Sequence, residues 1–117
     1  EKQPGNVIAL NNLAWLYHQK NDDRARAMAQ RAYLLGPTAH VADTFGWILT
    51  TQGDAVLALP LLRQAARELP TEPSVQYHYA VALNEAGHKE EAANVLRTAN
   101  FPEKTEATRL YESLARR

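Results

Sequence analysis

The feature that most constrains this chain is an internal repeat with a period of about thirty-four residues, and the best copy spans residues 38–70. Thirty-four residues separate Gly53 from Gly87, and the same interval separates Ala58 from Ala92. A weaker copy precedes residue 38 at an interval of thirty-two to thirty-three residues. A period of this length predicts stacked helical hairpins, because a single hairpin cannot bury its own apolar face.

The composition narrows the function classes. The chain has 117 residues, which is enough for one domain, and 13 basic residues balance 13 acidic ones. This balance gives no indication of a nucleic-acid partner or an anionic membrane surface. Cysteine is absent, which excludes disulfides, thiolate metal ligands and a cysteine nucleophile. No apolar run reaches the roughly 20 residues that a membrane-spanning helix needs, so we expect no direct insertion by this segment.

Apolar residues recur at helical spacing in seven segments. The pattern predicts helices over residues 7–19, about 24–35, 39–52, 54–68, 73–85, 88–98 and 103–116. Asn6 and Thr38 are expected to cap the first and third helices, and Asp22 or Asp23 the second. Pro60 lies inside the fourth segment, where we expect a kink rather than a break, because the apolar period continues through it.

These helices pair into units with a single-domain organisation over residues 1–117. Residues 1–6 are expected to end a preceding repeat, because Pro4 lies thirty-three residues before Pro37 and the chain begins with Glu1 rather than Met. Residues 7–38, 39–72 and 73–101 form three repeats, and 102–117 a helix that caps the last one. The open N-terminal end is then a candidate surface for self-association.

The repeated residues resemble the tetratricopeptide repeat family. The large aromatic residue that opens the family pattern is missing from all three units, whereas the small residue at the helix crossing is always present. The resemblance implies an all-α, right-handed solenoid of three hairpins with a C-terminal capping helix. The residues that carry it are Leu10, Leu13, Ala14, Tyr17, Ala25, Ala29 and Pro37; Ala42, Phe45, Gly46, Leu49, Ala58, Leu62 and Pro70; and Gln76, Tyr79, Ala80, Leu83, Ala92 and Leu96.

A shorter resemblance concerns two phrases, residues 10–17 and residues 43–47. They look like the C-terminal repeats of large bacterial lipoproteins associated with exopolysaccharide and PEP-CTERM/exosortase systems. This second resemblance implies a bacterial cell-envelope location on the periplasmic side, with a cytoplasmic location as the alternative.

The first resemblance also implies where a ligand binds, because members of the family usually hold an extended peptide on the concave face. Two tryptophans at equivalent positions and a tyrosine would form an aromatic ladder with amide and carboxylate groups beside it. The alternative is that both tryptophans only pack between successive helices. The predicted ligand-binding residues are Asn11, Trp15, His18, His40, Asp43, Trp47, Thr50, Tyr77, Val81 and Asn84, flanked by Ile8 and Ser74.

The predicted stripe contains no Lys or Arg, which argues against the carboxylate clamp of some family members. The four histidines lack the spacing of a metal site, and neither a nucleophile motif nor a phosphate-binding loop occurs. His40 and Asp43 lie three residues apart and could meet, most simply as a surface pair. We therefore expect no enzyme activity, no metal and no cofactor.

Three functions remain open from the sequence. The preferred hypothesis is a protein-interaction or scaffolding module that binds a peptide or a partner protein on the concave face. The alternative is a module that contacts polysaccharide in an exopolysaccharide export or assembly system, with Trp15, Trp47 and Tyr77 stacking on sugar rings. The third is a structural spacer whose concave face binds nothing.

Overall fold

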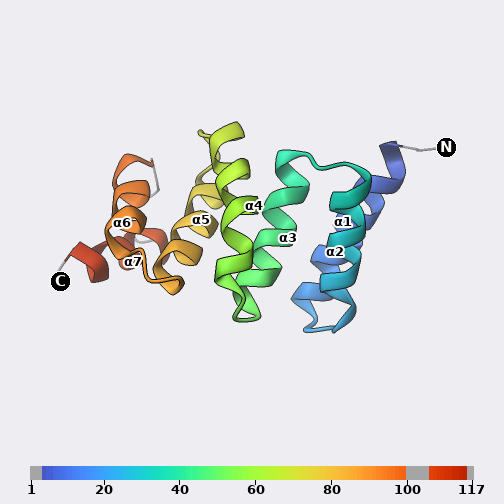
Figure 1. Ribbon diagram of the computed structural model, residues 1–117, viewed down its shortest axis with the longest axis horizontal. Helices are drawn as coiled ribbons and strands as arrows, with labels where there is room; N and C mark the ends of the chain where they lie inside the picture. The colour runs from blue at the N-terminus through green and yellow to red at the C-terminus, as the bar shows by residue number, and fades with distance from the viewer. Residues whose placement is uncertain (1–3, 100–105, 116–117) are drawn as a thin grey trace.

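The computed structural model describes residues 4–99 and 106–115, and these residues form seven α helices arranged in one elongated row. The molecule measures 50 × 26 × 23 Å, and α1 and α7 lie at opposite ends of its long axis (Figure 1). The helices are α1 Pro4–Gln19, α2 Arg24–Leu35, α3 Ala39–Thr51, α4 Ala55–Glu68, α5 Pro73–Glu85, α6 Lys89–Thr98 and α7 Glu106–Ala115.

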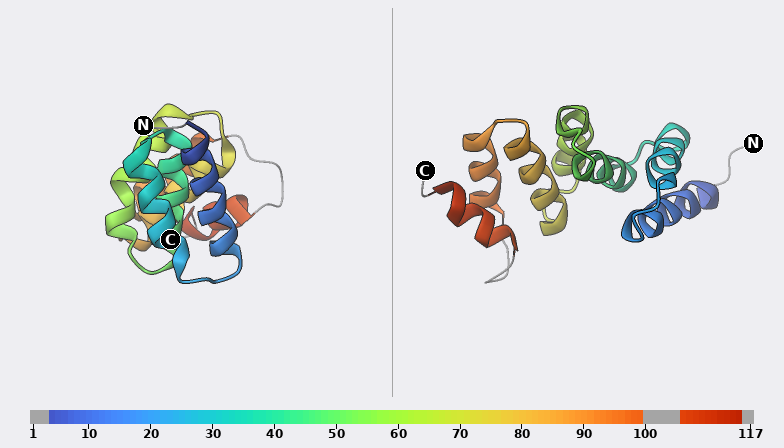
Figure 2. Two further views of the ribbon diagram at one scale, coloured as in Figure 1. Left: turned by 90° about the vertical axis from the view of Figure 1, so that its right-hand side faces the viewer. Right: turned by 90° about the horizontal axis from the view of Figure 1, so that it is seen from below.

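Each odd-numbered helix from α1 to α5 packs on the helix that follows it, which gives three consecutive hairpins. Figure 2 shows these hairpins one after another along the row. The first helices of the hairpins also contact one another, since α3 touches both α1 and α5, and α7 covers the last hairpin by packing on α6. The chain is therefore an all-α solenoid with α1, α3 and α5 side by side.

Small residues let the two helices of a hairpin approach closely. The equivalent positions Ala14, Gly46 and Ala80 are all buried, as the repeat pattern predicted. The contact is tightest in the second hairpin, where a Cβ atom added to Gly46 would lie 2.6 Å from Leu62 Cγ. Leu62 is itself fully buried. Its side chain packs directly against the α3 backbone at Gly46, and this contact holds α3 and α4 together.

The helix boundaries follow local chemistry. Thr38 caps α3, because its side-chain oxygen accepts a hydrogen bond from the Val41 backbone N–H at 3.4 Å. At the start of α2, Asp22 rather than Asp23 caps the helix. Its Oδ1 accepts a hydrogen bond from the Arg24 backbone N–H at 2.9 Å. Gly53 and Gly87 follow α3 and α5 with φ angles of +88° and +95°, a conformation that glycine adopts without strain.

The prediction for the first helix was wrong at its start. α1 begins at Pro4, and Asn6 lies inside it rather than capping it. Proline has no backbone N–H and a fixed φ, so it is favoured in the first turn of a helix, where that N–H has no partner. In the fourth helix, α4 runs unbroken through Pro60, whose side chain is exposed. The predicted start of the last helix, including Pro102, lies outside the described residues.

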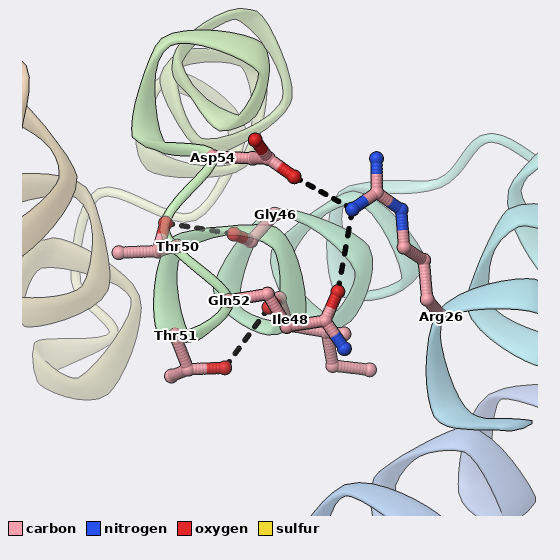
Figure 3. A network of polar contacts seen from close by, with 7 residues as sticks. All are labelled: Arg26, Gly46, Ile48, Thr50, Thr51, Gln52 and Asp54. Atoms are coloured by element: carbon pink, nitrogen blue, oxygen red, sulfur yellow. Dashed lines mark hydrogen bonds and ion pairs between the residues drawn. The ribbon is translucent and has the colours of Figure 1, made fainter. Parts of the chain in front are cut away.

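A polar contact joins the first hairpin to the second (Figure 3). Arg26 on α2 donates to Asp54 Oδ2 at 2.6 Å and to Gln52 Oε1 at 3.3 Å, both in the turn between α3 and α4. The two charged side chains are 41% and 40% exposed, so solvent screens this ion pair and its contribution to stability is small.

The described helices were also searched for membrane spans, and none of them combines the length and the apolar composition that crossing a bilayer requires.

Candidate functional site

The first helices of the three hairpins enclose a hollow on one side of the solenoid. Its volume is about 610 Å³, and we call it the central hollow. Five of the nine lining residues lie on α1, and α3 and α5 contribute two each. The lining residues are Asn11, Asn12, Trp15, Leu16, Gln19, Asp43, Thr44, Ser74 and His78.

A hydrogen bond between the second and third hairpins lies in this wall. His78 Nδ1 is 2.8 Å from Asp43 Oδ1, although thirty-five residues separate the two in the sequence. A carboxylate only accepts hydrogen bonds, so Nδ1 carries the proton and donates it. The two side chains are only 12% and 15% exposed, which strengthens the contact relative to one in open solvent.

His78 is also the centre of an aromatic cluster, which consists of Trp15, Trp47, Tyr77 and His78. Its ring stacks on Trp47 with the centroids 4.2 Å apart and the planes inclined by 20°. Tyr77 is 6.2 Å from His78 and 6.1 Å from Trp47, and Trp15 is 6.5 Å from His78. The imidazole therefore connects the two tryptophans, and all four rings lie on α1, α3 and α5.

Two amide oxygens on the same helices are buried without a hydrogen-bond partner among the described residues. They are Oδ1 of Asn11 on α1 and Oδ1 of Asn84 on α5. A buried acceptor with no donor costs about 1–3 kcal/mol. Asn11 lines the central hollow, but its Oδ1 has almost no exposed surface, so a ligand would relieve this cost only if the side chain rotated toward it.

The titration behaviour of two residues reflects this crowding. The pKa of His18 is lowered, first because burial disfavours its charged form and second because His78 lies nearby. The pKa of Tyr77 is raised, mainly by burial and then by Glu106, whose carboxylate accepts a hydrogen bond from the Tyr77 hydroxyl at 3.4 Å. Both shifts favour the uncharged forms of His18 and Tyr77 near neutral pH.

The structure brings most of the predicted site residues to α1, α3 and α5, but not all as surface. Thr50 is 2% exposed, so it is buried rather than on the surface, and its hydroxyl donates to the Gly46 carbonyl at 2.8 Å (Figure 3). His40 is exposed near the start of α3. Asp43 pairs with His78 of the next hairpin, and no hydrogen bond between His40 and Asp43 occurs among the described residues. Val81 is half-buried on α5.

Five residues that line the central hollow were not selected by the repeat pattern, namely Asn12, Leu16, Gln19, Thr44 and His78. The stripe predicted from the repeats passes through Tyr77 and Val81, and the positions equivalent to His78 in the other two hairpins are Thr44 and Asn12. Because neither is aromatic or charged, no repeated signal marks the position. The only sequence cue was a histidine one residue away from the predicted stripe.

The central hollow offers one carboxylate, three amide side chains, one imidazole, the hydroxyls of Thr44 and Ser74, and the aromatic surface of Trp15. Within residues 4–99 and 106–115, no three His, Asp or Glu side chains come together in a way that could hold a metal ion.

Solved structures that share this fold align with most of the chain. A single-residue mutant of MamA superposes with a TM-score of 0.80 at 24% identity, covering 94% of this chain and 66% of that one. A second MamA structure, labelled AMB-1, gives 0.69 at 26% identity and covers 78% and 55%. The type III secretion translocator chaperone SycD of Yersinia enterocolitica gives 0.81 at 24% identity and covers 99% and 86%. This chain thus spans about two thirds or less of the length of the two MamA structures.

A search of curated proteins found no match to the sequence. The family model described as tetratricopeptide repeat, in contrast, matches residues 49–116, which is more than half of the chain. Its match includes the second half of the best copy of the repeat and the whole of the third hairpin. Together with the stacked helical hairpins, this match shows that the chain belongs to the tetratricopeptide repeat family.

Proposed function

We propose that this chain is a non-catalytic binding module that holds an extended segment of a partner protein against α1, α3 and α5. The observation that carries the proposal is the central hollow, whose wall combines aromatic rings with an unpartnered amide oxygen. Solenoid repeats characteristically present such a continuous concave surface for ligands.

The residues around the hollow are suited to a peptide for two reasons. Trp15 and Trp47 are half-buried, so each is held in place by packing and still retains surface for a ligand. Asn11 and Asn84 are half-buried amides whose Oδ1 atoms lack a donor, so rotation of either side chain would let a backbone N–H of an extended peptide supply one. Aromatic anchors beside orienting hydrogen bonds are typical of protein recognition.

The proposed contact residues are Asn11, Trp15, His18, Asp43, Trp47, Tyr77, Val81 and Asn84 from the predicted stripe, together with His78. Their joint position on three adjacent helices would let one segment contact all three hairpins. A spacer role would use the same tryptophans only for packing between hairpins. The exposed part of the aromatic cluster favours a binding role over that spacer.

A polysaccharide is the competing ligand, because aromatic rings beside amide and carboxylate groups also suit sugars. The stacking of Trp47 on His78 argues against it for that ring, since one face of the indole is already covered at 4.2 Å. Trp15 is tilted relative to its neighbours rather than stacked, so its ring remains the better platform for a sugar.

Tryptophan fluorescence tests the proposal, because both tryptophans of the chain lie at the site. The chain is titrated with peptides selected from a random library and, separately, with acidic, neutral and basic oligosaccharides. A saturable spectral change with peptides alone supports the proposal, and a change with oligosaccharides alone replaces it with the polysaccharide function. The absence of any response to either ligand class overturns the proposal.

The tryptophan variants provide the matched control. Trp15→Leu is expected to weaken binding of the selected peptide while the protein remains folded by circular dichroism. Tyr111→Leu, a change of a half-buried aromatic residue on α7, is expected to leave peptide binding unchanged. Equal loss of binding in both variants would show that stability rather than contact accounts for the effect.

A further inference from the structure

The central hollow has an unusual balance of hydrogen-bonding groups. Asp43 contributes a carboxylate that only accepts, and Asn11 contributes a buried oxygen with no donor. Neither lysine nor arginine is among the nine residues that line the hollow. Among neutral donors and acceptors, the hollow therefore carries one carboxylate, that of Asp43, and no permanently positive side chain to neutralise it.

Asp43 retains capacity for a second partner. Among the hydrogen bonds of the described residues it accepts one, at Oδ1 from His78. A carboxylate has about four acceptor positions, so Oδ2 remains able to bind a donor. A carboxylate that is only 15% exposed is poorly solvated, and an additional cation would compensate for the lost hydration.

Apolar surface stands beside this carboxylate. Trp15 is in the wall of the hollow, and Leu16 is 44% exposed in the same wall. Cations are attracted to the face of a tryptophan ring within about 6 Å of its centroid. The aliphatic stem of a long basic side chain also packs well on exposed leucine while its charged end reaches polar groups.

From this combination we propose that the central hollow receives a lysine or arginine side chain of the bound peptide, with its charge between the Asp43 carboxylate and the Trp15 ring. Rotation of the Asn11 side chain would let its Oδ1 accept one of the N–H groups, and Leu16 would contact the aliphatic stem. This inference rests on the proposed peptide-binding function and specifies the kind of peptide segment that binds at the central hollow. The partner is accordingly a protein with an exposed, extended basic segment.

The test compares matched peptides in which only the charge of one side chain changes. A peptide selected for binding is remade with lysine replaced by norleucine, or arginine by citrulline, and affinity is measured at about pH 8, where an ordinary histidine is neutral. Removal of one charge is expected to weaken binding by about tenfold or more. If the neutral peptides bind equally well, the inference is overturned while peptide binding stands.

A double-mutant cycle locates the charge. Asp43→Asn keeps the size of the side chain and removes its charge, and it is expected to abolish most of the difference between the lysine and norleucine peptides. Glu68→Gln makes the same kind of change at an exposed position on α4 and is expected to leave that difference intact. If a folded Asp43→Asn variant still binds the lysine peptide more tightly than the norleucine peptide, the assignment to the central hollow is overturned.

The two proposals fail in distinguishable ways. If library selection yields no peptide that binds, the proposed function fails and this inference falls with it. If peptides bind but selection shows no enrichment of lysine or arginine, only this inference fails.

Discussion

Asp43 Oδ1 and His78 Nδ1 lie 2.8 Å apart and join the first helices of the second and third hairpins. Each side chain is mostly withdrawn from solvent, and the imidazole also stacks on Trp47. This contact therefore joins two hairpins and also lies in the wall of the central hollow. A ligand that engages Asp43 would consequently act on a residue that already holds two repeats together.

The energetic importance of this contact can be measured by a double-mutant cycle. We expect Asp43→Asn and His78→Gln each to lower the free energy of unfolding, with a coupling energy of about 0.5–3 kcal/mol between them. Urea denaturation of the two single variants and the double variant gives the coupling. A coupling energy near zero would show that the contact contributes nothing beyond the two separate side chains.

The close approach of α3 and α4 leads to a prediction at Gly46. Alanine favours a helix over glycine by about 1 kcal/mol, but overpacking a core costs about 1–3 kcal/mol. Because the added Cβ would lie 2.6 Å from Leu62 Cγ, we expect Gly46→Ala to destabilise the protein by about 1 kcal/mol. Thermal and urea unfolding provide the measurement.

A second variant separates the two effects at this position. In a Leu62→Ala background the clash is absent, so Gly46→Ala should instead stabilise the protein through helix propensity. If Gly46→Ala stabilises the unmodified protein as well, the tight crossing of α3 and α4 is not the controlling factor.

His18 gives the chain a defined pH dependence. Burial, and then the proximity of His78, lowers its pKa, so the unfolded state binds a proton at higher pH than the folded state does. Stability is therefore expected to decrease as the pH falls below the ordinary histidine value of about 6.5 toward the lowered value. His18→Gln should make this decrease shallower between about pH 7.5 and pH 5.

The unmodified protein, measured over the same pH range, is the reference for this experiment. An identical profile in His18→Gln and in the unmodified protein would contradict the assignment.

The contact between Arg26 and Asp54 is expected to contribute little. Exposed ion pairs usually stabilise proteins by about 0.2–1 kcal/mol, and salt screens them. We expect Arg26→Met, which keeps much of the aliphatic stem, to cost no more than about 1 kcal/mol, and less at high salt. Arg31→Met, on the same helix at an exposed position, is the matched control in urea denaturation. A loss well above that range would show that the contact has a larger role in joining the hairpins.

Much of the fold could be predicted from the sequence, because repeated local signals agree with repeated packing. Gly53 and Gly87 mark helix ends at the same place in two hairpins, and Ala14 and Ala80 are equivalent small residues at helix crossings. The start of α1 was missed, since Asn6 is a good cap in isolation and a proline in the first turn is equally compatible with a helix.

The candidate site was less predictable for a physical reason. The repeat register shows which face of each first helix is equivalent between hairpins. The burial of residues along that face, however, depends on their neighbours from other hairpins. Thr50 lies on the predicted stripe and is nevertheless buried, and the Gly46 carbonyl within α3 gives its hydroxyl a hydrogen-bond partner. His78 lies off the stripe, and its link to Asp43 arises from the packing of α3 against α5.

The most direct test of peptide binding on the side formed by α1, α3 and α5 uses the two tryptophans as reporters. The indole N–H groups of Trp15 and Trp47 give two separate signals in a nitrogen–proton correlation spectrum, and single Trp→Phe variants assign them. On addition of a library-selected peptide, we expect both signals to shift together with backbone signals of α1, α3 and α5. Saturable shifts confined to α2, α4 and α6, with both indole signals unchanged, would contradict it.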